Sequence, residues 1–275
     1  MRPLVLLMLT AGLGLSLTAL SPAHAQGAGQ TPSTPSASLP VKQGLAMELP
    51  PVAEDAALVA AIASTTRPEE DRARDGDRHP HETLTFWGLQ PGLTVVEIEP
   101  GAKGWWRNIL EPYAADTGGT YVPVARPLET MGVEAGQADL IVVARAFHNW
   151  ARSERTEPYL AAFFAALKPG GILAVEQHRG LEGLSASETA STVYVSESYV
   201  IHAAQAAGFE LDARSDINAN PKDDRDHAFG VWTLKPVRRS EAAGRSLSAE
   251  ERAEYDAIGE SDRMTLRFRK PVTAQ

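Results

Sequence analysis

The residues with the clearest chemical potential in this chain stand at or just after the ends of short apolar runs. Glu97 lies near the end of the run 94–99, and Gly101 and Gly104 follow it. Glycines let a backbone approach a bound molecule closely, and a carboxylate can hold a polar or positively charged group. The same glycines also suit a strand-to-helix turn without any ligand, so the spacing alone leaves both interpretations open.

A second polar stretch, His148, Asn149 and Trp150, follows the apolar run 139–144. Because imidazole titrates near neutral pH, His148 is a candidate general base, and a histidine hydrogen-bonded within its own loop is the alternative. The indole of Trp150 could stack on a ligand, or it could belong to the core beside a helix start.

Two later stretches complete the set. Glu176, His178 and Arg179 end the run 172–177, where they form either a charged floor for a substrate or an ion pair that closes a strand. Asn218 and Asn220 lie in a loop whose residues also favour turns. Four such stretches at corresponding strand ends of one sheet would form a site.

The elements that must position these residues follow from the hydrophobic pattern. Strands are expected over residues 94–99, 121–124, 139–144, 172–177, 209–215 and 229–234, with the last two pairing. Helices are expected over residues 105–115, 154–167 and 196–207. This alternation predicts an α/β fold with a parallel sheet and helices on both faces, in which ligands bind beyond the carboxyl ends of the strands.

The flanking segments carry weaker patterns. Residues 55–64 and 79–88 are expected to be helices, and the charged run 67–78 between them reads as a solvated helix face. Near the other end, residues 240–258 form a charged, helical pattern, and residues 263–269 alternate as an extra strand would.

The first 25 residues have the pattern of a secretory signal peptide, with a basic start, an apolar run and the small-residue site Ala23-His24-Ala25. The apolar run is slightly shorter than the roughly 20 residues that span a bilayer, which favours cleavage over an uncleaved anchor. Residues 26–53 are expected to be a flexible linker, and residues 54–270 the folded domain. Export predicts a periplasmic or secreted protein with no stable membrane anchor after cleavage.

Composition excludes several classes of protein. The chain is 43% hydrophobic and 22% charged with a net charge of -9, and it has no basic cluster, so no nucleic-acid partner is expected. Because it has no cysteine, a disulfide framework and a lipid-bearing cysteine are excluded. The seven histidines are scattered without metal-ligand spacing, and neither a nucleophile elbow nor a phosphate-binding loop occurs, so no metal is expected.

Several segments together resemble a known group of proteins. "DRARDGDRHPHETLTFWGLQPGLTVVEIEPG", "FHNW", "LKPGGILAVEQHR", "INANPKDDRDHAFGVWTL" and "IGESDRMTLRF" are similar to the exported branch of the predicted class I S-adenosylmethionine-dependent methyltransferases of bacteria, over roughly residues 67–270. The resemblance implies a Rossmann-like methyltransferase fold, a three-layer sandwich with a mostly parallel sheet, normally of seven strands with the last one antiparallel.

The resemblance also implies roles for the polar stretches, with S-adenosylmethionine as cofactor and a small molecule as methyl acceptor. The cofactor contacts would be Glu97, Gly101, Gly104 and Asn149, with Glu129 as the substitute for an acid that this family places after its second strand. From their residue types and their places after strands, the expected catalytic set is His148, Glu176 and His178, and the expected substrate set is Trp150, Arg179, Asn218 and Asn220.

Two departures from the family pattern bear on the cofactor. The loop "PGAKGWW" is one residue longer than the compact glycine loop of the family and holds Lys103, and Ala125-Arg126 stand where the acid after the second strand is expected. The segment 124–139 is too short for a complete further strand-helix crossover, which takes ~30 residues, so the sheet should be trimmed at one edge. A non-catalytic small-molecule-binding protein that kept the fold and lost cofactor affinity is therefore the alternative, and a different small-molecule enzyme in the same crevice is a third possibility.

Overall fold

The computed structural model describes residues 55–272, which belong to the unit Val52–Gln275. The predicted signal peptide, residues 1–25, and the predicted linker, residues 26–53, lie outside the described residues. Within residues 55–272, no helix has both the length and the apolar character needed to cross a bilayer.

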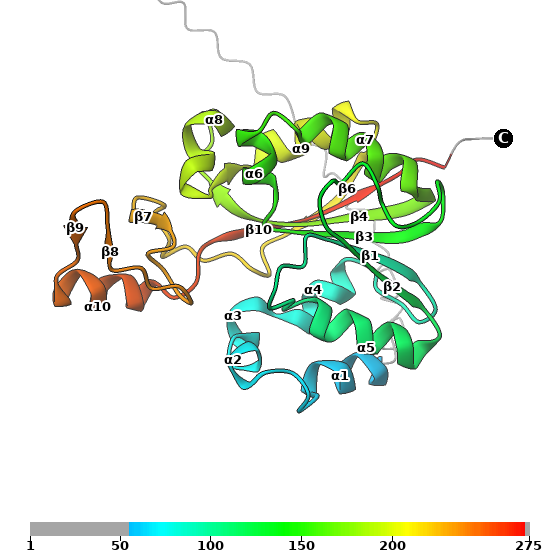
Figure 1. The fold of residues 1–275 in the computed structure, drawn as a ribbon, viewed down its shortest axis with the longest axis horizontal. Coiled ribbons are helices and arrows are strands. Elements are labelled where there is room, and N and C mark those ends of the chain that lie inside the picture. Colours follow the sequence, from blue (N-terminus) through cyan, green and yellow to red (C-terminus); the bar gives the residue numbers. More distant parts are fainter. Residues whose placement is uncertain (1–54, 273–275) are drawn as a thin grey trace, which may run out of the picture. The chain divides into compact units, whose positions relative to one another are not determined.

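A seven-stranded sheet forms the centre of this unit (Figure 1). Its strands lie in the order β2-β1-β3-β4-β10-β6, and the short β5 (Val195–Ser196) pairs with the end of β4. The bounds are β1 (Thr94–Ile98), β2 (Thr120–Val124), β3 (Ala138–Ala144), β4 (Leu167–Gly180), β6 (Glu210–Ser215) and β10 (Arg263–Arg269). The strands β2, β1, β3 and β4 are parallel, whereas β10 is antiparallel to both β4 and β6, which confirms the predicted mostly parallel α/β sheet.

Apart from the antiparallel β10 between β4 and β6, the order of strands is that of a doubly wound sheet with one strand missing. The common order 3-2-1-4-5-6 places a further strand beyond the second one. Here β2 lies at the edge, and the segment 125–137 that leads to β3 contains neither helix nor strand. The predicted trimming of one edge is therefore confirmed. The direction of winding reverses between β1 and β3, and a ligand of such a sheet binds at this point.

Helices cover both faces of the sheet (Figure 1). One face carries α1 (Ala56–Ala63), α4 (Pro80–Phe86) and α5 (Arg107–Thr117), and the other carries α6 (Phe147–Arg152), α7 (Thr156–Ala166) and α9 (Glu197–Ala206). The remaining elements are α2 (Glu69–Arg72), α3 (Asp75–Arg78), α8 (Ala186–Thr189), η1 (Ala190–Thr192), β7 (Ala228–Val231), β8 (Glu241–Ala242), β9 (Arg245–Ser246) and α10 (Ala249–Ile258).

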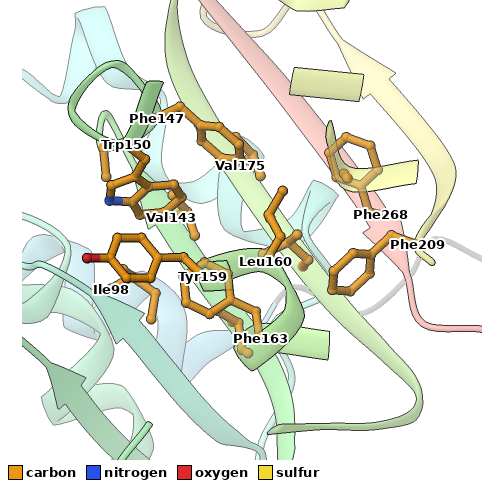
Figure 2. Packing of buried hydrophobic residues seen from close by; sticks show 14 of the residues in the cluster. Ile98, Val143, Phe147, Trp150, Tyr159, Leu160, Phe163, Val175, Phe209 and Phe268 are labelled. Carbon is orange, nitrogen blue, oxygen red and sulfur yellow. The ribbon is translucent and has the colours of Figure 1, made fainter. Parts of the chain in front are cut away.

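The central strands are apolar on nearly every residue because both of their faces are covered. Val143 of β3 and Val175 of β4 point toward the aromatic side chains of α6 and α7, as Figure 2 shows. The residues just before them, Val142 and Ala174, belong to the cluster on the opposite face with α1 and α5. The run "DLIVVA" is therefore buried on two sides, as its lack of polar residues predicts.

The charged run 67–78 is only in part the solvated face that its composition predicts. Arg67 and Arg78 are 1% exposed and Asp71 is 2% exposed. The guanidinium groups of the two arginines lie against the Trp105 ring, with Cζ of Arg78 4.8 Å from the ring centroid. Arg67 also forms an ion pair with Asp75 at 2.7 Å. The prediction is therefore wrong for these three residues, which are paired, hydrogen-bonded or stacked inside the fold, and it holds for Glu69, Glu70 and Asp77, which are exposed.

The predicted pairing of residues 209–215 with 229–234 is also wrong. β6 pairs with β10, which inserts between β4 and β6. The alternating segment that looked like an accessory strand therefore lies inside the sheet, with Leu266 and Phe268 0% exposed. The pattern of β10 identifies a strand, but its neighbours are decided by pairing across a long sequence separation.

Two element bounds differ from expectation in ways that affect the site. The stretch containing His148 and Asn149 is a short helix, α6, that precedes α7. β4 begins at Leu167, so the "LKPGG" turn is the irregular start of this strand, where the register with β3 shifts.

Replacing Leu266 with alanine should reduce the free energy of unfolding by about 2–5 kcal/mol, because it leaves a cavity where β10 crosses the core. The matched change Leu181→Ala, at a leucine that is 49% exposed, should change it by less than about 0.5 kcal/mol. Urea unfolding of the full chain measures both. Equal effects of the two substitutions would show that β10 is peripheral.

Candidate functional site

A cavity of about 580 Å³ opens at the carboxyl ends of β1, β2 and β3. Its walls are residues 99–101 after β1, 125–126 after β2 and 144–146 after β3, together with Asn149. The cavity thus lies at the reversal of strand order, and its volume falls in the usual range for small-molecule sites, roughly 300–1,000 Å³. Of the polar stretches expected to meet at this edge, the first two reach the cavity, through Gly101 and Asn149.

The two glycines of the loop after β1 have different functions in the fold. Gly101 lines the cavity at φ +69°, and a side chain there would meet no atom within 4 Å, so its backbone faces open space. Gly104 is buried at φ +55°, and a Cβ atom there would lie 2.6 Å from Nε of Arg107. Gly101 therefore allows close approach of a ligand, whereas Gly104 is favoured by its positive φ and leaves room for the guanidinium of Arg107. Lys103 between them is exposed and does not line the cavity.

The two tryptophans of the loop lie beneath it in the core. Trp105 is 4% exposed and Trp106 is 1% exposed, and their rings meet edge to face with centroids 4.6 Å apart. Trp106 Nε1 donates to Oε2 of Glu176 at 3.1 Å, and Trp105 Nε1 donates to the carbonyl of Asp71 at 3.1 Å. These bonds attach the loop to β4 and α2, so the tryptophans hold the cavity wall in place without occupying the cavity.

Glu97, the acid predicted to contact the cofactor, does not line the cavity. It is 2% exposed, and its Oε2 accepts a hydrogen bond from the hydroxyl of Tyr121 at 2.7 Å. Burial raises the pKa of Glu97 to about 7. The structure therefore assigns this carboxyl a buried position in the layer between the sheet and α5.

Glu99 is the acid that faces the cavity. Its carboxylate accepts hydrogen bonds from Arg126 Nε at 2.6 Å and from Trp150 Nε1 at 3.0 Å. Its backbone nitrogen donates to Val124 at 2.8 Å and its φ is +50°, a conformation that turns the side chain toward the end of β2. The acid that the sequence lacks after β2 is thus supplied by the residue that follows β1.

Of the two other predicted cofactor residues, one lines the cavity and one does not. Asn149 lines the cavity from α6. Glu129 does not, because it pairs with Arg155 at the surface, where its side chain is 42% exposed. Glu99 therefore takes the position at the end of β2 that was expected of Glu129.

The three predicted catalytic residues lie behind the cavity and do not line it. Burial lowers the pKa of His148 to about 4 and that of His178 well below its usual range, so both imidazoles are neutral at pH 7. His178 Nδ1 lies 2.5 Å from the Ser261 hydroxyl. Burial alone would raise the pKa of Glu176, but Arg263 and other arginines hold it below its usual value.

The four predicted substrate residues are engaged in structural contacts. Trp150 is 0% exposed and packs against Phe147, so it fills the core and does not stack on a ligand (Figure 2). Arg179 lies 3.2 Å from Asp216 and 3.4 Å from Glu197.

The two asparagines among these predicted substrate residues attach the last segments to the sheet. Asn218 donates to the hydroxyls of Thr83 and Thr265 at 3.0 Å, and Asn220 donates to the carbonyls of Ile258 and Glu260 at 2.9 and 2.6 Å. Both amide groups therefore satisfy buried or half-buried polar atoms of the fold and lie away from the cavity.

Asp223, Asp224 and His227 bring their polar atoms within 4.8 Å of one another. The carboxylate of Asp223 already accepts from the Tyr194 hydroxyl at 2.8 Å and from the backbone of Asp262 at 2.7 Å, and it lies 2.7 Å from His227 Nε2. These bonds use most of its acceptor capacity, so the group is a hydrogen-bonded support for the C-terminal segments.

Sequence reasoning missed two cavity residues besides Glu99. Arg126 and Arg145 line the cavity directly after β2 and β3. Their positions immediately after predicted strands were a usable signal, because side chains at these positions meet at one edge of a parallel sheet.

No family model matches this sequence, and no curated protein matches it either. Similar solved structures include a protein assigned as a sarcosine dimethylglycine methyltransferase from Galdieria sulphuraria, at 14% identity over 74% of this chain and 88% of that chain, with a TM-score of 0.47. The [4+2]-cyclase SpnF has 15% identity over 71% and 81% of the two chains and a TM-score of 0.46. An S-adenosylmethionine-dependent methyltransferase from Mesorhizobium loti has 14% identity over 71% and 99%, with a TM-score of 0.40. These similarities concern the fold and leave the site to be judged from its own residues.

The raised pKa of Glu97 should make stability depend on pH. The usual pKa of this carboxyl is 4.5, so between pH 4.5 and about 7 the folded state holds a proton that the unfolded state has lost. The free energy of unfolding should therefore fall as pH rises through this window, by roughly 3 kcal/mol. In Glu97→Gln this fall should be absent, as measured by urea unfolding at a series of pH values.

An exposed acid on the adjacent helix provides the control for this pH dependence. Glu111→Gln, in α5, should keep the wild-type dependence because Glu111 is solvent-exposed. If Glu97→Gln and the wild type lose stability in parallel across the window, Glu97 does not hold a proton in the fold.

Proposed function

We propose that this protein is an exported S-adenosylmethionine-dependent methyltransferase that acts on a small molecule. The observation that supports this most is the position of the cavity at the reversal point of the sheet, between β1 and β3. The inserted antiparallel β10 and the glycine loop after β1 are features that the resemblance to class I methyltransferases implies. Function on such a fold depends on the residues of the site.

The cavity residues suit the parts of S-adenosylmethionine. The backbone at Gly101 opens on the cavity, and the amide of Asn149 can both donate and accept hydrogen bonds. A carboxylate has about four acceptor positions, and in Glu99 two are used by Arg126 and Trp150. The positions that remain match the paired hydroxyls of a ribose.

When bound, S-adenosylmethionine would supply a methyl group made electrophilic by its sulfonium sulfur. Transfer of such a group depends on positioning and on exclusion of water more than on a covalent nucleophile. The cavity walls of this chain contribute apolar surface for this purpose at Pro100, Ala125, Ala144 and Ala146. The buried tryptophans beneath the loop keep these walls fixed.

A second function, binding without catalysis, is favoured by a specific observation. Within residues 55–272, Glu99 is the one titratable base among the cavity walls, and it is already bonded to Arg126 and Trp150. The histidines predicted as bases lie behind the walls. The two functions differ in outcome, because only the first converts S-adenosylmethionine to S-adenosylhomocysteine in the presence of an acceptor.

Calorimetric titration of the purified chain with S-adenosylmethionine and S-adenosylhomocysteine tests the cofactor. Glu99→Gln should weaken binding about tenfold, because it removes a charged acceptor of hydrogen bonds. Glu129→Gln, at the surface pair with Arg155, should leave binding within about twofold of the wild type. Absence of binding of either compound at millimolar concentration would overturn the proposal.

A further inference from the structure

Six charged side chains gather behind the cavity, where β4 ends and β10 begins. We call them the arginine–glutamate cluster, and its members are Arg74, Arg78, Arg145, Arg263, Glu176 and Glu260. Guanidinium groups stay protonated in proteins, and both glutamates have pKa values below their usual range despite their burial. Four positive charges thus face two negative ones.

The nearby histidines add no charge to this balance. Burial lowers the pKa values of His148 and His178 below neutral pH. Within residues 55–272 the arginine–glutamate cluster itself therefore carries an excess of two positive charges, and Glu97, which interacts with Arg145, adds a negative charge only above its raised pKa of about 7. Such an excess is costly in a low-dielectric interior unless a counter-charge arrives.

The ion pairs of the cluster leave several donors without partners. Glu260 contacts Arg74 at 2.6 Å, Arg78 at 3.1 Å and Arg263 at 2.7 Å, and Glu176 lies 3.1 Å from Arg263. Within the described part of the chain, buried Nη1 of Arg78 and Nη2 of Arg74 nevertheless have no hydrogen-bond partner. The buried Oε1 of Glu176 also has no hydrogen-bond partner, although it lies 3.1 Å from Nε of Arg263, so the pairing within the cluster is incomplete for donors and acceptors alike.

Arg145 is the member of the cluster that reaches the cavity. It follows β3 at φ +58°, its backbone nitrogen donates to the carbonyl of Glu176 at 2.7 Å, and the residue lines the cavity together with Gly101 and Asn149. Its Nε is buried without a partner, and its guanidinium makes no ion pair or hydrogen bond with any residue of 55–272. Arg126, on the opposite wall, is by contrast paired with Glu99.

We propose that the cavity receives an acidic group at Arg145, and that the methyl acceptor is therefore a small molecule bearing a carboxylate or a phosphate. This identification of the acceptor rests on the proposed methyltransferase function, whereas the anion site itself does not. The guanidinium fork matches both anions with two parallel hydrogen bonds. The excess charge of the arginine–glutamate cluster behind it strengthens the attraction.

The proposal predicts a response to simple anions. Inorganic phosphate and benzoate should raise the unfolding temperature of the wild-type chain above that in sodium chloride of equal ionic strength. In Arg145→Gln this rise should be lost, and the unfolding temperature in chloride alone should be equal to or above that of the wild type, because an unpaired buried charge is gone.

Two further variants keep this test decisive. Arg238→Gln, at a surface arginine paired with Asp256, should respond to the anions as the wild type does. If Arg145→Gln fails to fold, Arg145→Lys keeps the charge without the fork and should show a reduced response. An equal rise in the wild type and in the Arg145 variants would show a non-specific ion effect and overturn the proposal.

The carboxylate of the cofactor is the other possible source of an acidic group, and calorimetry separates the two. If Arg145 receives the acceptor, S-adenosylhomocysteine should bind Arg145→Gln within about threefold of the wild type. A loss of about tenfold or more would place the cofactor's own carboxylate at Arg145 and overturn the assignment to the acceptor. If phosphate or benzoate binds but S-adenosylhomocysteine does not, the anion site stands and the methyltransferase function fails.

Discussion

The neutralisation of Glu176 and Glu260 by arginines constrains most of the structure. Glu260 pairs with Arg78 of α3 and with Arg263 of β10, and Glu176 near the end of β4 pairs with the same Arg263. These ion pairs connect the first helices, the centre of the sheet and the last strand. Because a buried charge that loses its partner costs about 3–5 kcal/mol, the pairs also fix where these segments can lie.

The same constraint explains the unusual loop after β1. Trp106 donates to Glu176, and the ring of Trp105 lies under the guanidinium of Arg78, so the bulky residues of the loop are bound to the arginine–glutamate cluster. The loop can therefore be long and aromatic while its remaining residues, from Glu99 to Gly101, form a cavity wall. The contacts of Trp105 and Trp106 with the arginine–glutamate cluster therefore hold this loop in place, although it is longer than the compact loop that was expected.

The sheet and most of its helices were predictable because their signals are local. Apolar runs of five or six residues identify β1 and β3, and glycines mark the ends of helices. The place of β10 and the burial of Arg67 and Arg78 were not predictable, because they depend on segments far apart in the sequence. The composition of a charged run is the same whether its side chains are hydrated at the surface or are buried against a carboxylate and an aromatic ring.

The sequence alone determined the α/β class, the trimmed edge and the edge of the sheet at which polar residues meet, since all three follow from the lengths and periods of its segments. Only the tertiary structure decided which of those residues face the cavity. Glu97 and Glu99 are two positions apart, yet one is buried beside Tyr121 and the other turns to the end of β2 through a backbone conformation that no pattern encodes. Likewise, only the three-dimensional arrangement places Arg145 in the cavity wall while its buried Nε has no hydrogen-bond partner.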